Sequence, residues 1–278
     1  MNHFIELGES QNTGNIWVTI HSGSRNLGKK ICEYWQNIAY ERPLPDINKI
    51  ILEIKEKFPK KEWQEEIVKA KNKIGSTKKS ELDYLKGKDL DGYLSDMYFA
   101  QEYASTNRRI IMQTIISVLR ETVYEKYFKV KETIETVHNY IDSTDYIIRK
   151  GAIRSYIGEK MIIPFNMRDG ILICEGKSNS EWNFSAPHGA GRVYSRSKAK
   201  EELDLQKFEK DMEGIYSTSV GRGTIDESPD AYKDSNIIEK AIEPTAKILD
   251  RIIPIHNMKD VSDEKPWKKK NNKEKEER

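Results

Sequence analysis

We expect an α+β fold in which helices flank a β-rich centre, and two patterns in the sequence are consistent with it. The longest helical pattern runs from Gly92 to Tyr127, where apolar residues recur at steps of three and four. Short runs rich in β-branched residues, separated by glycine and proline turns, then occupy residues 133 to 195. We therefore expect a central buried helix followed by a β-rich core.

The first segments predict a strand and then a helix. Residues 14 to 21 are dense in β-branched and aromatic residues and run into a glycine turn, which is typical of a strand. From Asn26 to about Tyr40 the pattern is helical, and the prolines within 41 to 45 end it. Residues 46 to 91 are rich in lysine and glutamate with a scattered apolar period. They predict solvated helices of a charged insertion that carries no chemistry.

The last third of the chain predicts two further helices, at residues 198 to 213 and 235 to 250. From residue 260 to 278, lysine, glutamate and asparagine dominate. Such a composition cannot bury enough apolar surface to fold, so this segment is predicted to be a disordered tail.

Composition excludes several classes of protein. With 278 residues, 37% hydrophobic and 33% charged, the chain is long enough for one large domain and too polar for a membrane protein. Lys plus Arg total 47 against 45 Asp plus Glu, so any RNA site must be a local patch. Cys32 and Cys174 form no CxxC pair, which indicates a reduced chain without a disulfide framework. Without an apolar run of transmembrane length or a signal peptide, we expect a cytoplasmic protein.

Histidine is scarce, and its placement suggests a site. Of five histidines, four lie in compact polar strings beside glycine, asparagine or serine: His3, His21, His138 and His188. A lone histidine at a strand end is more often structural, but the joint pattern favours a site built from loops, since imidazole is the commonest metal ligand. His256 lacks such neighbours and is predicted to be structural.

Among these polar strings, the one that follows His188 is the strongest indication of a binding site. Gly-Ala-Gly at 189–191 lets backbone amides approach an anion, and Arg192 and Arg196 can surround phosphate oxygens. The alternative is a glycine-rich turn with two solvated arginines.

Seven strings, in register, resemble those of the RtcB RNA-splicing ligases, and together they are specific where no single string would be. The match runs from residue 2 to about 260 and is interrupted only by 46–91. The strings are NHFIE at 2–6, HSGSRNLG at 21–28, YLSDMYFAQEYASTNR at 93–108, HNY at 138–140, RKGA at 149–152, HGAGRVYSR at 188–196 and DESPDAYKD at 226–234.

The resemblance implies a single RtcB-like ligase domain over residues 1–259, and it is the main basis of the α+β assignment. It also implies a reaction that uses GTP and manganese. A histidine is guanylylated, the nucleotide passes to an RNA 3′-phosphate derived from a 2′,3′-cyclic phosphate, and the 5′-hydroxyl of a second RNA displaces GMP. RNA and GTP are then the expected partners.

Carried over residue by residue, the resemblance implies three groups of site residues. His188 is the guanylylated nucleophile, and His3, His21 and His138 are manganese ligands. The nucleotide contacts are Asn2, Glu6, Asn166, His188, Gly189, Ala190, Gly191, Tyr232 and Lys259. The residues that hold RNA or other phosphates are Arg25, Arg192 and Arg196.

One departure from the family concerns the metal. In the family a preceding segment carries an Asp and a metal-bridging Cys, whereas neither Cys32 nor Cys174 lies in a matching context. We therefore expect an N-terminally truncated form that binds manganese weakly, unless a separate polypeptide supplies the missing ligands.

Two other functions remain open at this stage. The first is a noncatalytic relic that binds RNA or nucleotide without turnover. The second is a metal-dependent phosphoesterase that uses three histidines to hydrolyse cyclic-phosphate RNA without GTP.

Overall fold

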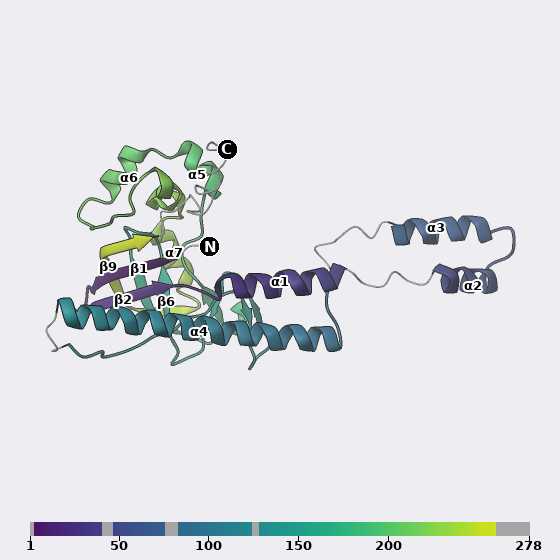
Figure 1. The fold of residues 1–278 in the computed structure, drawn as a ribbon, viewed down its shortest axis with the longest axis horizontal. Helices are drawn as coiled ribbons and strands as arrows, with labels where there is room; N and C mark the ends of the chain where they lie inside the picture. The colour runs from purple at the N-terminus through teal and green to yellow at the C-terminus, as the bar shows by residue number, and fades with distance from the viewer. Residues whose placement is uncertain (1–2, 41–46, 76–82, 124–127, 260–278) are drawn as a thin grey trace, which may run out of the picture. The chain divides into compact units, whose positions relative to one another are not determined.

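The computed structural model of the chain describes residues 3–40, 47–75, 83–123 and 128–259 (Figure 1). The described residues form two compact units. The first unit combines residues 3–22 with 108–259, and the second is Gly23–Asn107. Helices and an antiparallel sheet occur together, which confirms the α+β class.

The first unit is built on a five-stranded sheet of order β2-β1-β9-β7-β6, in which every neighbouring pair is antiparallel. Its strands are β1 (Phe4–Ser10), β2 (Ile16–His21), β6 (Lys160–Pro164), β7 (Ile171–Gly176) and β9 (Ala246–Lys259). Phe4 pairs with His21 on one side and with Lys259 on the other. The sheet therefore brings together the first and last strands of the described chain.

Two small antiparallel sheets carry the loops that hold the histidines. They pair β3 (Tyr140–Ile141) with β4 (Ile148–Arg149), and β5 (Ala152–Arg154) with β8 (Ser185–Pro187). His138 lies just before β3, and His188 follows β8 directly.

The main core lies along β6 and β7. Met161, Ile163, Leu172 and Cys174 are almost fully buried, and Ile242 of α7 (Ser235–Ile242) belongs to the same cluster. Burial raises the pKa of the Cys174 thiol to about 12, so this cysteine is an inert core residue.

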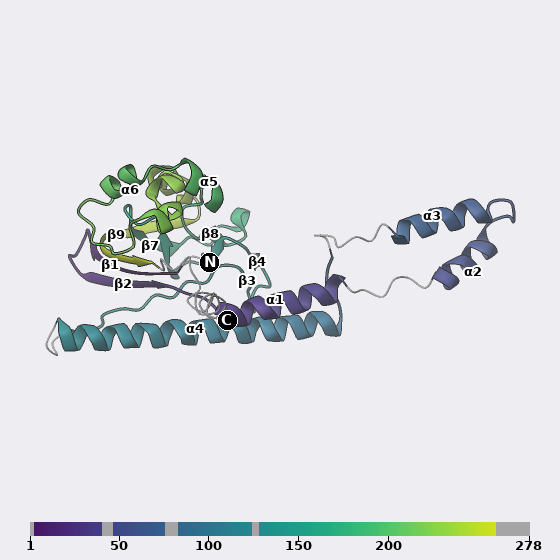
Figure 2. The same ribbon diagram turned by 45° about the horizontal axis from the view of Figure 1, so that its top comes forward.

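The remaining helical elements of this unit are short. They are α5 (Arg196–Glu202), α6 (Leu205–Asp211) and the 3-10 turns η1 (Ser180–Trp182), η2 (Arg222–Glu227) and η3 (Pro229–Ala231). The helix predicted at 198–213 is thus divided in two, because Asp204 caps α6 by accepting a bond from the Lys207 amide. In Figures 1 and 2, α5 and α6 lie close to each other.

The helix predicted at 235–250 forms only over its first half. Helix α7 ends at Ile242, and residues from Ala246 onward belong to β9, where Ile248 pairs with Cys174 of β7. Pro244 has no backbone N–H and so cannot donate a helical hydrogen bond. From Ala246 onward, the backbone groups form hydrogen bonds with β7 instead.

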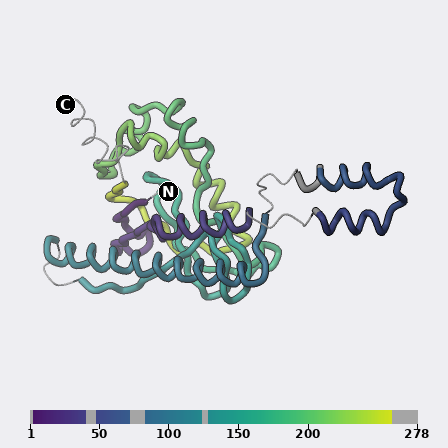
Figure 3. The backbone as a smooth tube through the Cα atoms, turned by 45° about the vertical axis from the view of Figure 1, so that its right-hand side comes forward, coloured from purple at the N-terminus to yellow at the C-terminus, as the bar shows by residue number. Residues whose placement is uncertain are grey.

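The second unit is helical. It contains α1 (Arg25–Tyr40), α2 (Ile47–Lys57), α3 (Trp63–Gly75) and the first part of α4 (Lys88–Thr122). Trp35 of α1 donates a 2.8 Å bond to Asp96 of α4, and any Cβ at Gly92 would overlap the Trp35 ring. Helices α2 and α3 run side by side as a hairpin (Figure 3).

The helix predicted at 92–127 is present as α4, which begins at Lys88 and ends at Thr122, but it is not buried as predicted. Only Ala100 and Ala104 are buried, whereas Phe99, Ile110 and Val118 are half or more exposed. The apolar residues of α4 are therefore not confined to the buried face of the helix, and many of them are exposed. Among the described helices, none is long and apolar enough to cross a membrane. The predicted tail at 260–278 lies outside the described residues.

Candidate active site

Three of the predicted histidines converge in the first unit. His21 ends β2, and its Nε2 atom lies 3.2 Å from Nε2 of His138. The ring centroid of His138 lies 4.8 Å from that of His188. Residues from three separate segments thus form one imidazole cluster.

The ring of His188 is held by a backbone carbonyl. Its Nδ1 donates to the Gly151 oxygen at 2.6 Å, and the Gly151 amide in turn donates to Asn139 Oδ1 at 2.6 Å. Gly151 has φ +66°, and a Cβ there would lie 3.3 Å from the His188 ring. In a neutral imidazole with its proton on Nδ1, the other nitrogen, Nε2, carries the lone pair.

The turn after His188 packs against the end of β6, with Ala190 buried and its neighbouring glycines half-buried. The Ala190 amide donates to the Pro164 carbonyl at 3.1 Å. Gly189 has φ +157°, and a Cβ there would lie 2.5 Å from that same oxygen. The Ala190 amide is thus engaged by the protein itself, and the close backbone approach accounts for the glycine.

The pair of His21 and His138 fits a metal ion in part. Two nitrogens about 2.1 Å from a common ion are roughly 3.0 to 3.4 Å apart, and the observed separation is 3.2 Å. Burial, and then the neighbouring His188, lower the pKa of His138, which favours the neutral form that binds metals. His3 precedes β1 directly. Across the described residues, however, no group of three or more His, Cys, Asp or Glu side chains is placed to hold a metal.

Glu6 lies buried on β1, opposite Asn257 of β9. The Asn257 side-chain amide donates to Glu6 Oε2 at 2.5 Å. Burial raises the pKa of Glu6 to about 7, against the lowering effect of Asn257 and Lys259. This carboxyl group is therefore poised to change charge near neutral pH.

Lys259, at the end of β9, lies in the same region. Its Nζ atom is 5.6 Å from the centre of the Phe4 ring and donates a 2.7 Å bond to Glu227. Tyr232 donates to the same Glu227 oxygen at 2.6 Å. The first unit therefore brings together three predicted nucleotide contacts that are far apart in the chain: Glu6, Tyr232 and Lys259.

The two arginines after His188 are paired with carboxylates. Arg196 donates to Asp226 at 2.5 Å and to Glu227 at 2.7 Å. Arg192 lies 3.4 Å from Glu227 and 5.1 Å from the centre of the Tyr232 ring. Asp226 and Glu227 were not among the predicted site residues, although both lie in the string at 226–234.

Three further predicted residues are Asn166, Arg25 and Asn2. Asn166 bonds within its own turn, where its side chain contacts the Arg168 amide and both the amide and the carboxylate of Asp169. Arg25 begins α1 in the second unit. Asn2 lies outside the described residues.

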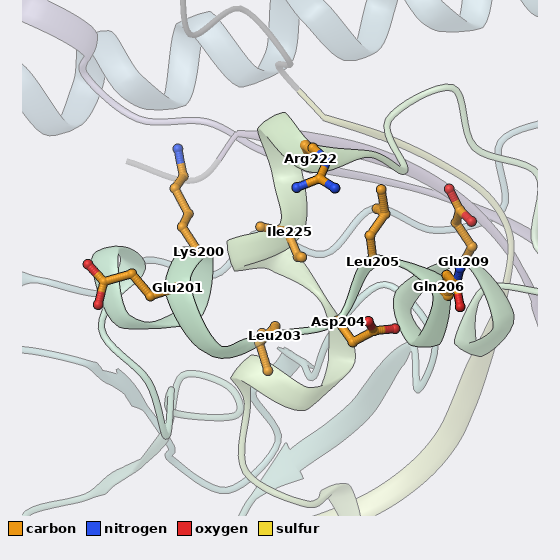
Figure 4. A pocket seen from close by; sticks show the side chains of 9 residues that line it. All are labelled: Lys200, Glu201, Leu203, Asp204, Leu205, Gln206, Glu209, Arg222 and Ile225. Carbon is orange, nitrogen blue, oxygen red and sulfur yellow. The ribbon is translucent and has the colours of Figure 1, made fainter.

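A separate pocket lies between α5, α6 and η2 (Figure 4). Lys200 and Arg222 line it together with acidic and apolar side chains. None of the predicted site residues is among those that line it.

Comparisons with known proteins identify a family and several relatives that match most of the chain. The family model described as tRNA-splicing ligase RtcB matches residues 1–260. The RNA-splicing ligase RtcB of Escherichia coli strain K12 is 29% identical over 258 residues, which cover 89% of this chain and 57% of the relative. The tRNA-splicing ligase RtcB of Aeropyrum pernix is 25% identical over 274 residues, covering 87% of this chain and 52% of the relative. The chain thus spans about half the length of the curated relatives it matches.

Proposed function

The chain belongs to the RtcB family, and from this premise we propose that it acts as an RNA ligase that joins a 2′,3′-cyclic phosphate or 3′-phosphate end to a 5′-hydroxyl end. The observation that carries the proposal is the cluster of His188, His138 and His21 with the His188 ring fixed by Gly151. GTP and RNA are its proposed substrates.

In this proposal Nε2 of His188 attacks the α-phosphorus of GTP. A nitrogen–phosphorus bond forms, and pyrophosphate leaves with the electron pair of the broken bond. The bond from Nδ1 to the Gly151 carbonyl orients the ring and stabilises the positive charge that develops on it. An RNA 3′-phosphate oxygen then takes the GMP from His188, and the 5′-hydroxyl of the second RNA displaces GMP in line.

We propose His21 and His138 as ligands of manganese, with His3 as the third imidazole. Bound manganese would neutralise phosphate oxygens and align the leaving group. Three imidazoles carry no negative charge, so the proposal includes further oxygen or thiolate ligands beyond these three.

For the nucleotide, Glu6, Lys259 and Tyr232 are the proposed base contacts. Guanine presents acceptors on one edge and N–H donors on another, which a lysine ammonium and a glutamate carboxylate can match. Lys259 is close enough to Glu6 to oppose the rise in its pKa that burial causes, which supports a single site for the base.

Labelled GTP tests the proposal. With manganese present, we expect an acid-labile protein–GMP adduct that His188→Ala abolishes and that His256→Ala, a change on β9 outside the imidazole cluster, retains. An adduct that survives in His188→Ala would contradict the proposal.

A noncatalytic nucleotide-binding relic is the second candidate. It is favoured by the lack of a three-ligand group among the described residues. If GTP binds but no adduct forms, even after the N-terminal portion of a relative is added, the relic is the better description.

A further inference from the structure

Glu227 is a buried carboxylate at which four side chains meet. Its Oε2 accepts bonds from Lys259 Nζ at 2.7 Å and from the Tyr232 hydroxyl at 2.6 Å. Its Oε1 accepts a 2.7 Å bond from Arg196 and a 3.4 Å bond from Arg192. The Glu227 side chain is only 6% exposed, so these partners take the place of water.

These contacts connect three separate parts of the chain. Glu227 ends η2, Lys259 ends β9, and Arg196 begins α5. Burial alone would raise the pKa of Glu227, but Lys259, Tyr232 and Arg196 together lower it to about 2. The carboxylate is therefore charged at neutral pH and acts as the counterion of the cluster.

Lys259 depends on this counterion. Burial lowers the pKa of its ammonium, and Glu227 is the first of the groups that oppose this effect. An ammonium has three N–H donors, and within the described residues only Glu227 accepts a side-chain bond from it. Two donors thus remain for a ligand.

We propose that Glu227 is a positioning residue of the nucleotide site, which holds the Lys259 ammonium and the Tyr232 ring where the guanine base binds without itself touching the nucleotide. The inference rests on the proposed function, because Lys259 and Tyr232 are nucleotide contacts only there. Both oxygens of Glu227 are already taken by protein donors, which is why it positions rather than binds.

The test compares Glu227→Gln and Glu227→Asp with the unchanged chain. Glutamine keeps the size of the side chain but loses the charge and places an N–H donor opposite other donors. Loss of a charged hydrogen bond is worth roughly 1.5 to 3 kcal/mol, so we expect the half-saturating GTP concentration to rise about tenfold or more. Aspartate keeps the charge and should recover part of the affinity. Once GTP saturates, the rate of adduct formation on His188 should be nearly unchanged, because Glu227 does not contact the reacting atoms.

Glu159→Gln is the matched control. Glu159 also pairs with an arginine, Arg154, but its side chain is 32% exposed and lies outside this cluster. It should leave GTP binding unchanged, and circular dichroism should verify that every variant is folded. If the folded Gln and Asp variants both bind GTP as the unchanged chain does, the inference is overturned while the proposed function stands. If the unchanged chain itself binds no GTP, the proposed function fails and the inference fails with it.

Discussion

Glu6 and Glu227 are both buried glutamates, but their surroundings move their pKa values in opposite directions. Burial dominates at Glu6, which has a neutral amide as its hydrogen-bond partner, and its pKa rises to about 7. At Glu227 the same burial effect is outweighed by Lys259, Tyr232 and Arg196, and the pKa falls to about 2. The number of donors around each carboxylate, rather than its depth, decides its charge.

The raised pKa of Glu6 predicts a fall in stability between pH 4.5 and about 7. In this window the unfolded chain has ionised the group while the folded chain still holds the proton, so folding is favoured less as pH rises. Glu6→Gln should remove a fall on the order of 1 to 3 kcal/mol. Urea unfolding at pH 4.5, 6 and 8 measures it.

The pH range in which stability changes distinguishes the effect of Glu6 from that of Glu227. The stability due to Glu227 is complete above its unfolded pKa of 4.5 and is lost only as pH falls toward 2. Equal slopes for the unchanged chain and Glu6→Gln between pH 4.5 and 8 would show that Glu6 does not carry the effect.

At the scale of elements, the short strands around the histidines are held by one buried arginine. Arg149 of β4 is 2% exposed and donates to Asp142 at 3.1 Å, to Asp145 at 2.8 Å and to Ser185 of β8 at 3.0 Å. Two- and three-residue strands have few ladder bonds of their own. Arg149 therefore joins the segments that carry His138, Gly151 and His188.

Arg149→Met is predicted to destabilise the fold by roughly 3 to 5 kcal/mol, because it leaves the buried Asp142 without its closest cation. Chemical denaturation measures this loss, and near-ultraviolet circular dichroism reports on aromatic packing in these loops. Arg154→Met is the control: Arg154 pairs with Glu159 and Asp142, but its side chain is 37% exposed. We expect a loss of about 1 kcal/mol or less there. Similar losses in both variants would contradict the proposed role of Arg149.

At the scale of the whole molecule, the α2–α3 hairpin is a self-contained feature of the second unit. Trp63 donates to the Phe58 carbonyl at 2.8 Å, and Lys55 lies 5.6 Å from the centre of the Trp63 ring. None of the predicted site residues falls within residues 47–75. That the charged insertion carries no chemistry stays a prediction.

Replacing residues 47–75 by a short glycine-serine linker tests this prediction. We expect the half-saturating GTP concentration to change by about twofold or less, because none of the predicted site residues lies in this segment. Far-ultraviolet circular dichroism should lose helical signal in proportion to the hairpin. A tenfold weaker affinity for GTP in a folded variant would assign the hairpin a part in binding.

Local patterns in the sequence determined the early strand and helix, the β-rich segment that carries His138 and His188, and the motif strings that mark the family. These features depend on neighbouring residues, so periodicity and turn chemistry are enough to find them. The position of β9 between β1 and β7, and the meeting of Glu227 with Lys259, were decided only by the tertiary structure. Strand pairing and buried ion pairs join residues far apart in the chain, and no local pattern encodes which distant segment satisfies a backbone group or a charge.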